Sequence, residues 1–163
     1  MTPHRARLRA RAAGLLLGLG LGGFVDGISL HQIAQWHNML SARVPPVTMA
    51  AMQTNMTADG YFHAGVLALT LAGVAALYAA AREASRGGAA LPRPRWFAGL
   101  MLAGWGAFNL VEGVIDHHLL ELHHVRDVPR HVPALDWAFL GVGGLGLLAL
   151  GWALARGADT SMP

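Results

Sequence analysis

The chain has 163 residues, of which 54% are hydrophobic and only 13% are charged, and its mean hydropathy is +0.41. This balance excludes a disordered chain and an ordinary soluble domain, and it is typical of an integral membrane protein. The formal net charge is +3, but the basic residues are all arginines without interleaved aromatic residues, so we exclude nucleic acid as a partner. The sequence contains no cysteine, which excludes disulfides and thiolate metal ligands.

Four apolar segments, each close to the ~20 residues that cross a bilayer as a helix, predict a single membrane domain. A basic tail at residues 1–11 comes first. The predicted spans then follow at about residues 12–36, 59–82, 95–120 and 134–156.

The first span carries Gly14, Gly18 and Gly22 at four-residue spacing, which favours the close approach of another helix. We expect its helix to continue past the membrane surface toward Leu40, before prolines break it. Short connections and the lack of a recognisable internal repeat predict an all-α, antiparallel four-helix bundle.

Arginines are distributed unevenly around the spans. Nine lie in the N-terminal tail, in the second connection and after the fourth span, whereas three lie in the other two connections. By the positive-inside rule, both termini are cytoplasmic and the first and third connections face the outer side.

Seven of the nine histidines and five of the nine acids lie around the predicted outer ends of the spans. Counting residues at a rise of about 1.5 Å places one polar residue of each helix at a similar height. Ionisable groups at this depth are costly, so they indicate a functional site. A hydrogen-bonded polar network without a metal is the alternative interpretation.

We interpret this cluster as a transition-metal site. The predicted ligands are Asp26, His31, His63, Glu112, Asp116 and His117. The residues expected to orient these ligands are His37, Asn109, His123, His124 and Asp136. Imidazole and carboxylate ligands suit one or two ions of zinc or iron, with copper as an alternative. We expect His118, His123, His124 and His131 to lie in or beside the outer loop.

Three segments resemble a family of bacterial predicted membrane proteins, grouped as domain of unknown function 2243. They read GFVDGI at 23–28 with LHQ at 30–32 and QWHNML at 35–40, DGYFH at 59–63, and FNLVEGVIDHHLL at 108–120 with HHVR at 123–126. The resemblance covers nearly the whole chain. It implies a four-span protein of the bacterial inner membrane, and it implies no activity.

The leading functional hypothesis is a membrane-embedded metalloenzyme, either a hydrolase or an oxidoreductase. In a hydrolase, Glu112 or Asp59 would act as general base on a lipid-like substrate. One alternative is a metal-handling protein that passes copper or zinc to a membrane protein partner, with the outer methionines as a capture surface. Another is a b-type haem protein with His31 and His63 as axial ligands. The sequence leaves homo-oligomerisation open.

Overall fold

The computed structural model describes residues 3–87 and 93–159, and all the regular secondary structure in these ranges is helical. Four long helical rods are apolar enough to cross a membrane, as predicted. The rods, three of which contain π-helical turns, are α1 (Pro3–Asp26) with η1 (Gly27–Ile33), α2 (Met49–Gly87), α3 (Pro94–Glu112) with η2 (Gly113–Leu119), and α4 (Pro133–Ala138) with η3 (Phe139–Gly146) and α5 (Leu147–Asp159).

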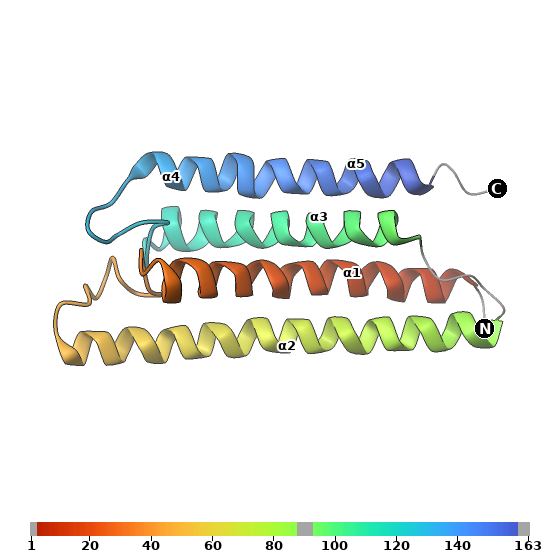
Figure 1. Ribbon diagram of the computed structural model, residues 1–163, viewed down its shortest axis with the longest axis horizontal. Coiled ribbons are helices and arrows are strands. Elements are labelled where there is room, and N and C mark those ends of the chain that lie inside the picture. The colour runs from red at the N-terminus through yellow and green to blue at the C-terminus, as the bar shows by residue number, and fades with distance from the viewer. Residues whose placement is uncertain (1–2, 88–92, 160–163) are drawn as a thin grey trace.

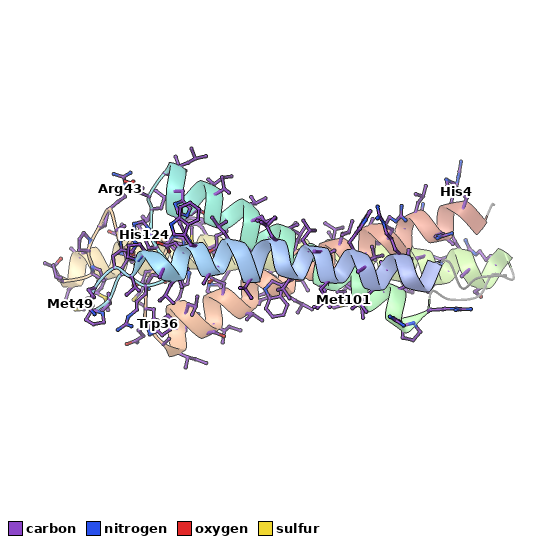
Figure 2. All side chains as sticks on the ribbon, turned by 90° about the horizontal axis from the view of Figure 1, so that it is seen from above. His4, Trp36, Arg43, Met49, Met101 and His124 are labelled. Carbon is purple, nitrogen blue, oxygen red and sulfur yellow. The ribbon has the colours of Figure 1, made fainter. Side chains whose placement is uncertain are left out.

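Consecutive rods run antiparallel, and the start of α1 and the end of α5 lie at the same end of the molecule (Figure 1). The helices α1 and α3 form the inner pair, α2 packs on α1, and α5 packs on α3. The predicted antiparallel four-helix bundle is therefore confirmed. The two loops that join η1 to α2 and η2 to α4 meet at the opposite end, where Trp36, Arg43 and His124 also lie (Figure 2).

The inner pair packs closely because glycines line both contact faces. A Cβ atom at Gly18 would lie 2.0 Å from the carbonyl oxygen of Met101, and one at Gly104 would lie 2.3 Å from that of Leu15. Neither position tolerates a side chain without movement of a helix. The four-residue glycine spacing thus corresponds to a real helix–helix contact.

The outer helices present apolar side chains outward. Only 17% of the most apolar window of α2 is buried, against 50% for α1 and 44% for α3. Leu71 on α2 and Val142 on η3 are 59% and 75% exposed. Apolar surface of this kind is suited to contact with lipid tails rather than water.

Helix limits differ from the expected ones in three places. The first helix begins at Pro3, so most of the expected basic tail is helical, and its Ala, Arg and Leu residues favour that state. The expected continuation to Leu40 is wrong, because the helix ends at Ile33 and Gln35 adopts a positive φ of 51°. The second helix begins earlier than expected, at Met49.

The two halves of the chain repeat one pattern, so the expectation of a chain without an internal repeat is wrong. In both halves the order is an acid, a glycine, three residues, a histidine, three residues, a Gln or Glu, one residue and a second histidine, at residues 26–37 and 112–123. The glycine starts a π-helix in each half, and the Gln or Glu has positive φ, 51° at Gln35 and 47° at Glu121. Each residue of the second copy therefore stands 86 positions after its counterpart, as 112 follows 26.

Candidate metal centre

The π-helical turns place an acid beside a histidine in each half. A π-helix bonds residues five apart, which brings Asp26 next to His31 and Glu112 next to His117. The Oδ2 atom of Asp26 lies 3.1 Å from Nε2 of His31. Glu112, His117 and His123 each offer one atom that could bind a metal ion, and these three atoms lie within 4.8 Å of one another.

The loop after each π-helix returns a second histidine to the same place. The rings of His37 and His123 stack with centroids 4.5 Å apart and planes 19° apart. Nδ1 of His37 donates to the carbonyl oxygen of Val125 at 2.9 Å, and Nδ1 of His123 donates to that of Met39 at 3.3 Å. Residues 39 and 125 are themselves counterparts, so the contact is reciprocal, as at a twofold interface.

In each half, a second carboxylate supports the first histidine from an outer helix. Nδ1 of His31 donates to Oδ1 of Asp59 at 3.0 Å, and the same oxygen accepts the backbone N–H of Met39 at 2.8 Å. In the second half, Nδ1 of His117 lies 3.6 Å from Oδ1 of Asp136, which accepts the backbone N–H of Val125 at 2.8 Å. The two halves therefore form a pseudo-twofold site.

These hydrogen bonds settle which imidazole nitrogen carries the lone pair. Carbonyl and carboxylate oxygens only accept, so the Nδ1 atoms of His31, His37 and His123 are donors and a neutral ring leaves its lone pair on Nε2. All three Nε2 atoms are buried and form no hydrogen bond in the described part of the protein. Oδ2 of Asp26 and both carboxylate oxygens of Glu112 are also buried without a hydrogen bond.

Each such unsatisfied buried group costs about 1–3 kcal/mol, so a cluster of them calls for a binding partner. The possible metal-ligand atoms of His31, His37 and His123 lie within 4.8 Å of one another. The same holds for those of Glu112, His117 and His123. A histidine that donates through Nδ1 to an oxygen and keeps Nε2 free has the arrangement usual for a metal ligand.

His123 lies in the loop beyond the predicted spans and is 0% exposed. Burial lowers the pKa of His123 well below its ordinary value of about 6.5, and the nearby imidazoles of His37 and His117 act in the same direction. Its ring is thus neutral at neutral pH, which is the form that binds a metal ion.

By symmetry the ligands divide into two triads, each with two imidazoles and one carboxylate. We call Asp26, His31 and His37 the first triad, and Glu112, His117 and His123 the second triad. Oδ2 of Asp26 lies 3.8 Å from Nε2 of His37, and Oε1 of Glu112 lies 3.4 Å from Nε2 of His123. Two imidazoles and a carboxylate are a ligand set suited to iron, zinc or manganese.

The predicted site residues that lie outside the triads include His63, Asn109 and Asp116. His63 donates through Nδ1 to the backbone oxygen of Asp59 at 2.7 Å, and its ring centroid lies 6.5 Å from that of His31. Asn109 donates to the backbone oxygen of Gly143 at 2.8 Å and joins α3 to η3. Asp116 is half-buried and belongs to none of the ligand groups found among the described residues.

The outer methionines do not form a surface around His37, which is 1% exposed. Met49, Met52 and Met56 lie on the first turns of α2 and are 77%, 41% and 65% exposed.

A second group of ligand-type residues lies closer to the surface. The donor atoms of His124, His131 and Asp136 lie within 4.8 Å of one another. His131 is exposed and His124 is half-buried. His131 lies in the outer loop, as expected, two residues before α4 begins at Pro133.

The sequence comparisons agree with this architecture but name no reaction. The chain shows no match to a curated protein or to a solved structure. Residues 13–158 match the family described as "Predicted membrane protein (DUF2243)". The match covers all four membrane-spanning helices and both triads, so the chain belongs to this family of predicted membrane proteins.

Proposed function

We propose that the protein is a membrane-embedded metalloprotein that holds two transition-metal ions, one in each triad. The observation that carries the proposal is the set of buried Nε2 and carboxylate atoms that lack hydrogen bonds, while the Nδ1 atoms of His31, His37 and His123 are fixed by oxygen acceptors. In a protein without ions, these atoms would keep only acid–imidazole contacts such as the 3.1 Å between Oδ2 of Asp26 and Nε2 of His31, which offset part of their desolvation cost.

The number of ions follows from the ligands. One imidazole nitrogen binds one ion, and His123 belongs to both groups of close ligand atoms, so an ion held by His31, His37 and His123 would leave Glu112 and His117 without one. Two ions use all six side chains of the triads. Iron and zinc are the favoured metals, and copper is the alternative.

Burial favours redox chemistry over the hydrolysis of a lipid-like substrate. The ligand side chains of both triads are at most 5% exposed, which leaves a bulky substrate little access to an ion. Electrons and small oxidants do not need such access.

The carboxylates named as general bases are better suited to other roles. Asp59 already accepts hydrogen bonds from His31, Asn38 and the Met39 backbone, so we propose that it positions His31. Glu112 has both oxygens free and is 4% exposed, which suits a ligand that could bridge two ions.

The packing of the imidazoles argues against a b-type haem. Axial ligands stand on opposite faces of the porphyrin, so the macrocycle separates their rings. In the expected axial pair, His31 and His63, Nε2 of His31 faces Oδ2 of Asp26 at 3.1 Å instead of a porphyrin iron. The ring centroids of His31 and His37 are 4.3 Å apart and those of His117 and His123 are 4.9 Å apart, which leaves no space for a porphyrin between either of these pairs.

Metal handling is a second candidate function. The observation that favours it is the group formed by His124, His131 and Asp136, which connects the surface with the second triad through Asp136. A handling protein would release its ions readily to a chelator or to a membrane protein partner, whereas a redox centre would retain them.

The arginine distribution supports an orientation in which the triads face the outer side of a bacterial inner membrane and both termini are cytoplasmic. This orientation rests on the arginines and not on the ligands, so it is a proposal separate from the metal site.

The test is metal analysis of the purified full-length protein together with ligand variants. We expect two transition-metal ions per chain to remain in the wild type after a brief wash with EDTA. His37→Ala and His123→Ala should each lose at least one ion. His118→Ala is the matched control, because His118 is an exposed histidine beside His117 that belongs to neither triad.

Wild-type protein without stoichiometric metal, or unchanged metal content in His37→Ala and His123→Ala, would refute the metal centre. One ion per chain would refute the two-ion arrangement. Redox activity of the bound ions is tested separately by a potentiometric titration of their optical or magnetic-resonance signals.

A further inference from the structure

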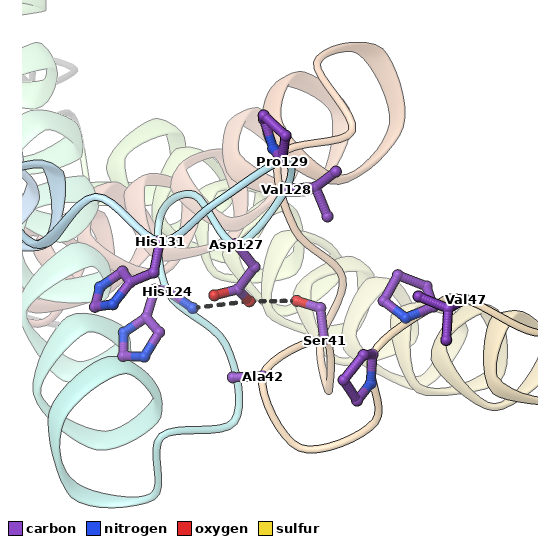
Figure 3. Close-up of a pocket in the computed structure, with 10 residues that line it drawn as sticks. Ser41, Ala42, Val47, His124, Asp127, Val128, Pro129 and His131 are labelled. Atoms are coloured by element: carbon purple, nitrogen blue, oxygen red, sulfur yellow. Dashed lines mark hydrogen bonds between the residues drawn. The ribbon is translucent and has the colours of Figure 1, made fainter.

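A pocket of about 580 Å³ opens between the two outer loops, close to the second triad. The loop residues 41–47 form one side and residues 124–131 form the other. Figure 3 shows the imidazoles of His124 and His131 side by side at one edge of this pocket, and Asp127 bonded to Ser41 across it. The pocket therefore offers water and ions a way to reach these two histidines.

Asp136 joins the two histidines below the pocket. Its Oδ2 atom lies 2.7 Å from Nε2 of His131 and 3.2 Å from Nδ1 of His124. The two rings stack with centroids 3.8 Å apart and planes 16° apart. Two imidazoles and one carboxylate again form a ligand set for a divalent cation, but here the His131 side chain is 39% exposed.

Comparison with the first half shows that this arrangement is not needed to hold the carboxylate. The counterpart of His124, 86 positions earlier, is Asn38, whose Nδ2 donates to Oδ2 of Asp59 at 2.8 Å. An amide side chain at this position therefore suffices to hold the carboxylate. In the second half, the imidazole of His124 takes the place of this amide. His131 adds a further imidazole at Oδ2 of Asp136, whereas Oδ2 of Asp59 accepts the Asn38 amide.

The Asp136 carboxylate also lies next to a buried histidine. Oδ1 of Asp136 lies 3.6 Å from Nδ1 of His117, a member of the second triad. One aspartate thus contacts an exposed imidazole through one oxygen and a buried imidazole through the other.

We propose that His124, His131 and Asp136 form a further, exchangeable divalent-cation site, and that ions enter the buried triads through it. The site itself stands on its own ligands, whereas its role as an entry route rests on the proposed function. Three protein ligands leave coordination positions for water, and the exposed His131 allows rapid exchange.

The experiment uses the purified, metal-free full chain and Co²⁺ as the probe. Cobalt uptake is followed by its visible absorption after rapid mixing, and its release is followed after EDTA is added. In the wild type we expect one ion that EDTA removes rapidly in addition to ions that it removes slowly. His131→Ala should lose the rapidly removed ion and fill the slow sites about tenfold more slowly, while their final content stays the same.

His118→Ala is the control, because His118 is exposed at the same end of the molecule but outside the group, and it should behave as wild type. The double variant His37→Ala/His123→Ala should keep the rapidly removed ion. An unchanged rapid fraction in His131→Ala would overturn the site, and an unchanged filling rate would overturn the route. A wild type with the rapid ion but no slow ions would refute the buried centre and the route while supporting the site.

Discussion

Nδ1 of His31 lies 3.0 Å from Oδ1 of Asp59, so a carboxylate of α2 fixes the orientation of an imidazole of the first π-helix. The same oxygen accepts the backbone N–H of Met39, and the other oxygen accepts the Asn38 amide. One side chain therefore joins α2, η1 and the loop that carries His37. This arrangement makes Asp59 a positioning residue for the first triad.

Replacement of this carboxylate by an amide should weaken metal binding without removing a ligand. In Asp59→Asn the negative charge that strengthens His31 as a donor is lost, and we expect metal affinity to fall about 10–100-fold. Competition with a chelator of known affinity measures the change. Asp116→Asn is the matched control, because Asp116 is a half-buried acid near the same end that no ligand group contains. Equal loss in both variants would contradict the role of Asp59.

Glu112→Gln should raise the stability of the metal-free protein and reduce the additional stability that metal binding gives. The buried carboxylate of Glu112 has no hydrogen bond, and a glutamine amide could donate to Nε2 of His123, 3.4 Å away. The metal-free variant should therefore gain about 1–3 kcal/mol in free energy of unfolding. The stabilisation by added metal, about 2.7 kcal/mol at a hundred times the dissociation constant, should be much reduced.

Unfolding in a denaturing detergent, with and without metal, measures both effects. A metal-free Glu112→Gln protein that is less stable than wild type would show that Glu112 is paired by a group other than an ion.

The helices could be predicted from the sequence because membrane insertion demands length and apolarity, which are local properties. The height of the polar residues followed in the same way, from the helical rise alone. What could not be predicted is where the helices stop being α-helical. The change to a π-helix after Asp26 and after Glu112 rotates each following histidine relative to an ideal α-helix.

His37 and His123 are ligand candidates in the structure, whereas the sequence analysis gives them supporting roles. Both lie in irregular loops, where helical periodicity carries no information, and both are placed by contacts with backbone oxygens far away in the sequence. The internal repeat was a usable signal, but its two copies share only an acid, a glycine and two histidines at fixed spacing. His63 lies at the predicted depth in the membrane, yet its Nδ1 donates to a backbone oxygen of its own helix, that of Asp59.

The close contact of α1 and α3 predicts a sensitivity to small additions of volume. A methyl group at Gly18 would meet the backbone of α3 at 2.0 Å, and α1 and α3 carry the two triads. We expect Gly18→Ala to lower the free energy of unfolding by about 1–3 kcal/mol and to weaken metal binding by separating the triads.

The matched control is Gly65→Ala on α2, where a Cβ atom would meet no neighbour within 4 Å. This variant should be as stable as wild type or slightly more stable, because alanine favours a helix by up to about 1 kcal/mol over glycine. Unfolding of both proteins in the same detergent provides the comparison, and equal stability of the two would contradict the packing argument.

The lowered pKa of His123 predicts a loss of stability in acid. In the unfolded chain this histidine binds a proton below a pH of about 6.5, whereas in the folded, metal-free protein it stays neutral until the pH is much lower. The unfolded state therefore binds more protons in this window, and the free energy of unfolding falls as the pH drops below about 6.5. In His123→Gln this contribution is absent.

The measurement is the difference between wild type and His123→Gln in unfolding free energy at pH 7.5 and at pH 5.5. We expect the wild type to lose more stability over this interval than the variant. The same loss in both proteins would show that other groups account for the acid sensitivity.

The orientation in the membrane can be tested with single cysteines, because the chain has none of its own. Val47 in the loop beside the candidate entry site is 84% exposed, and Ser85 lies exposed at the opposite end of α2. Neither substitution changes an arginine, so the signals that set the orientation stay in place. In intact cells, a membrane-impermeant maleimide should label Val47→Cys at once and Ser85→Cys only after permeabilisation. The reverse pattern would place the triads on the cytoplasmic side, where the metal would have to come from the cytoplasmic pool.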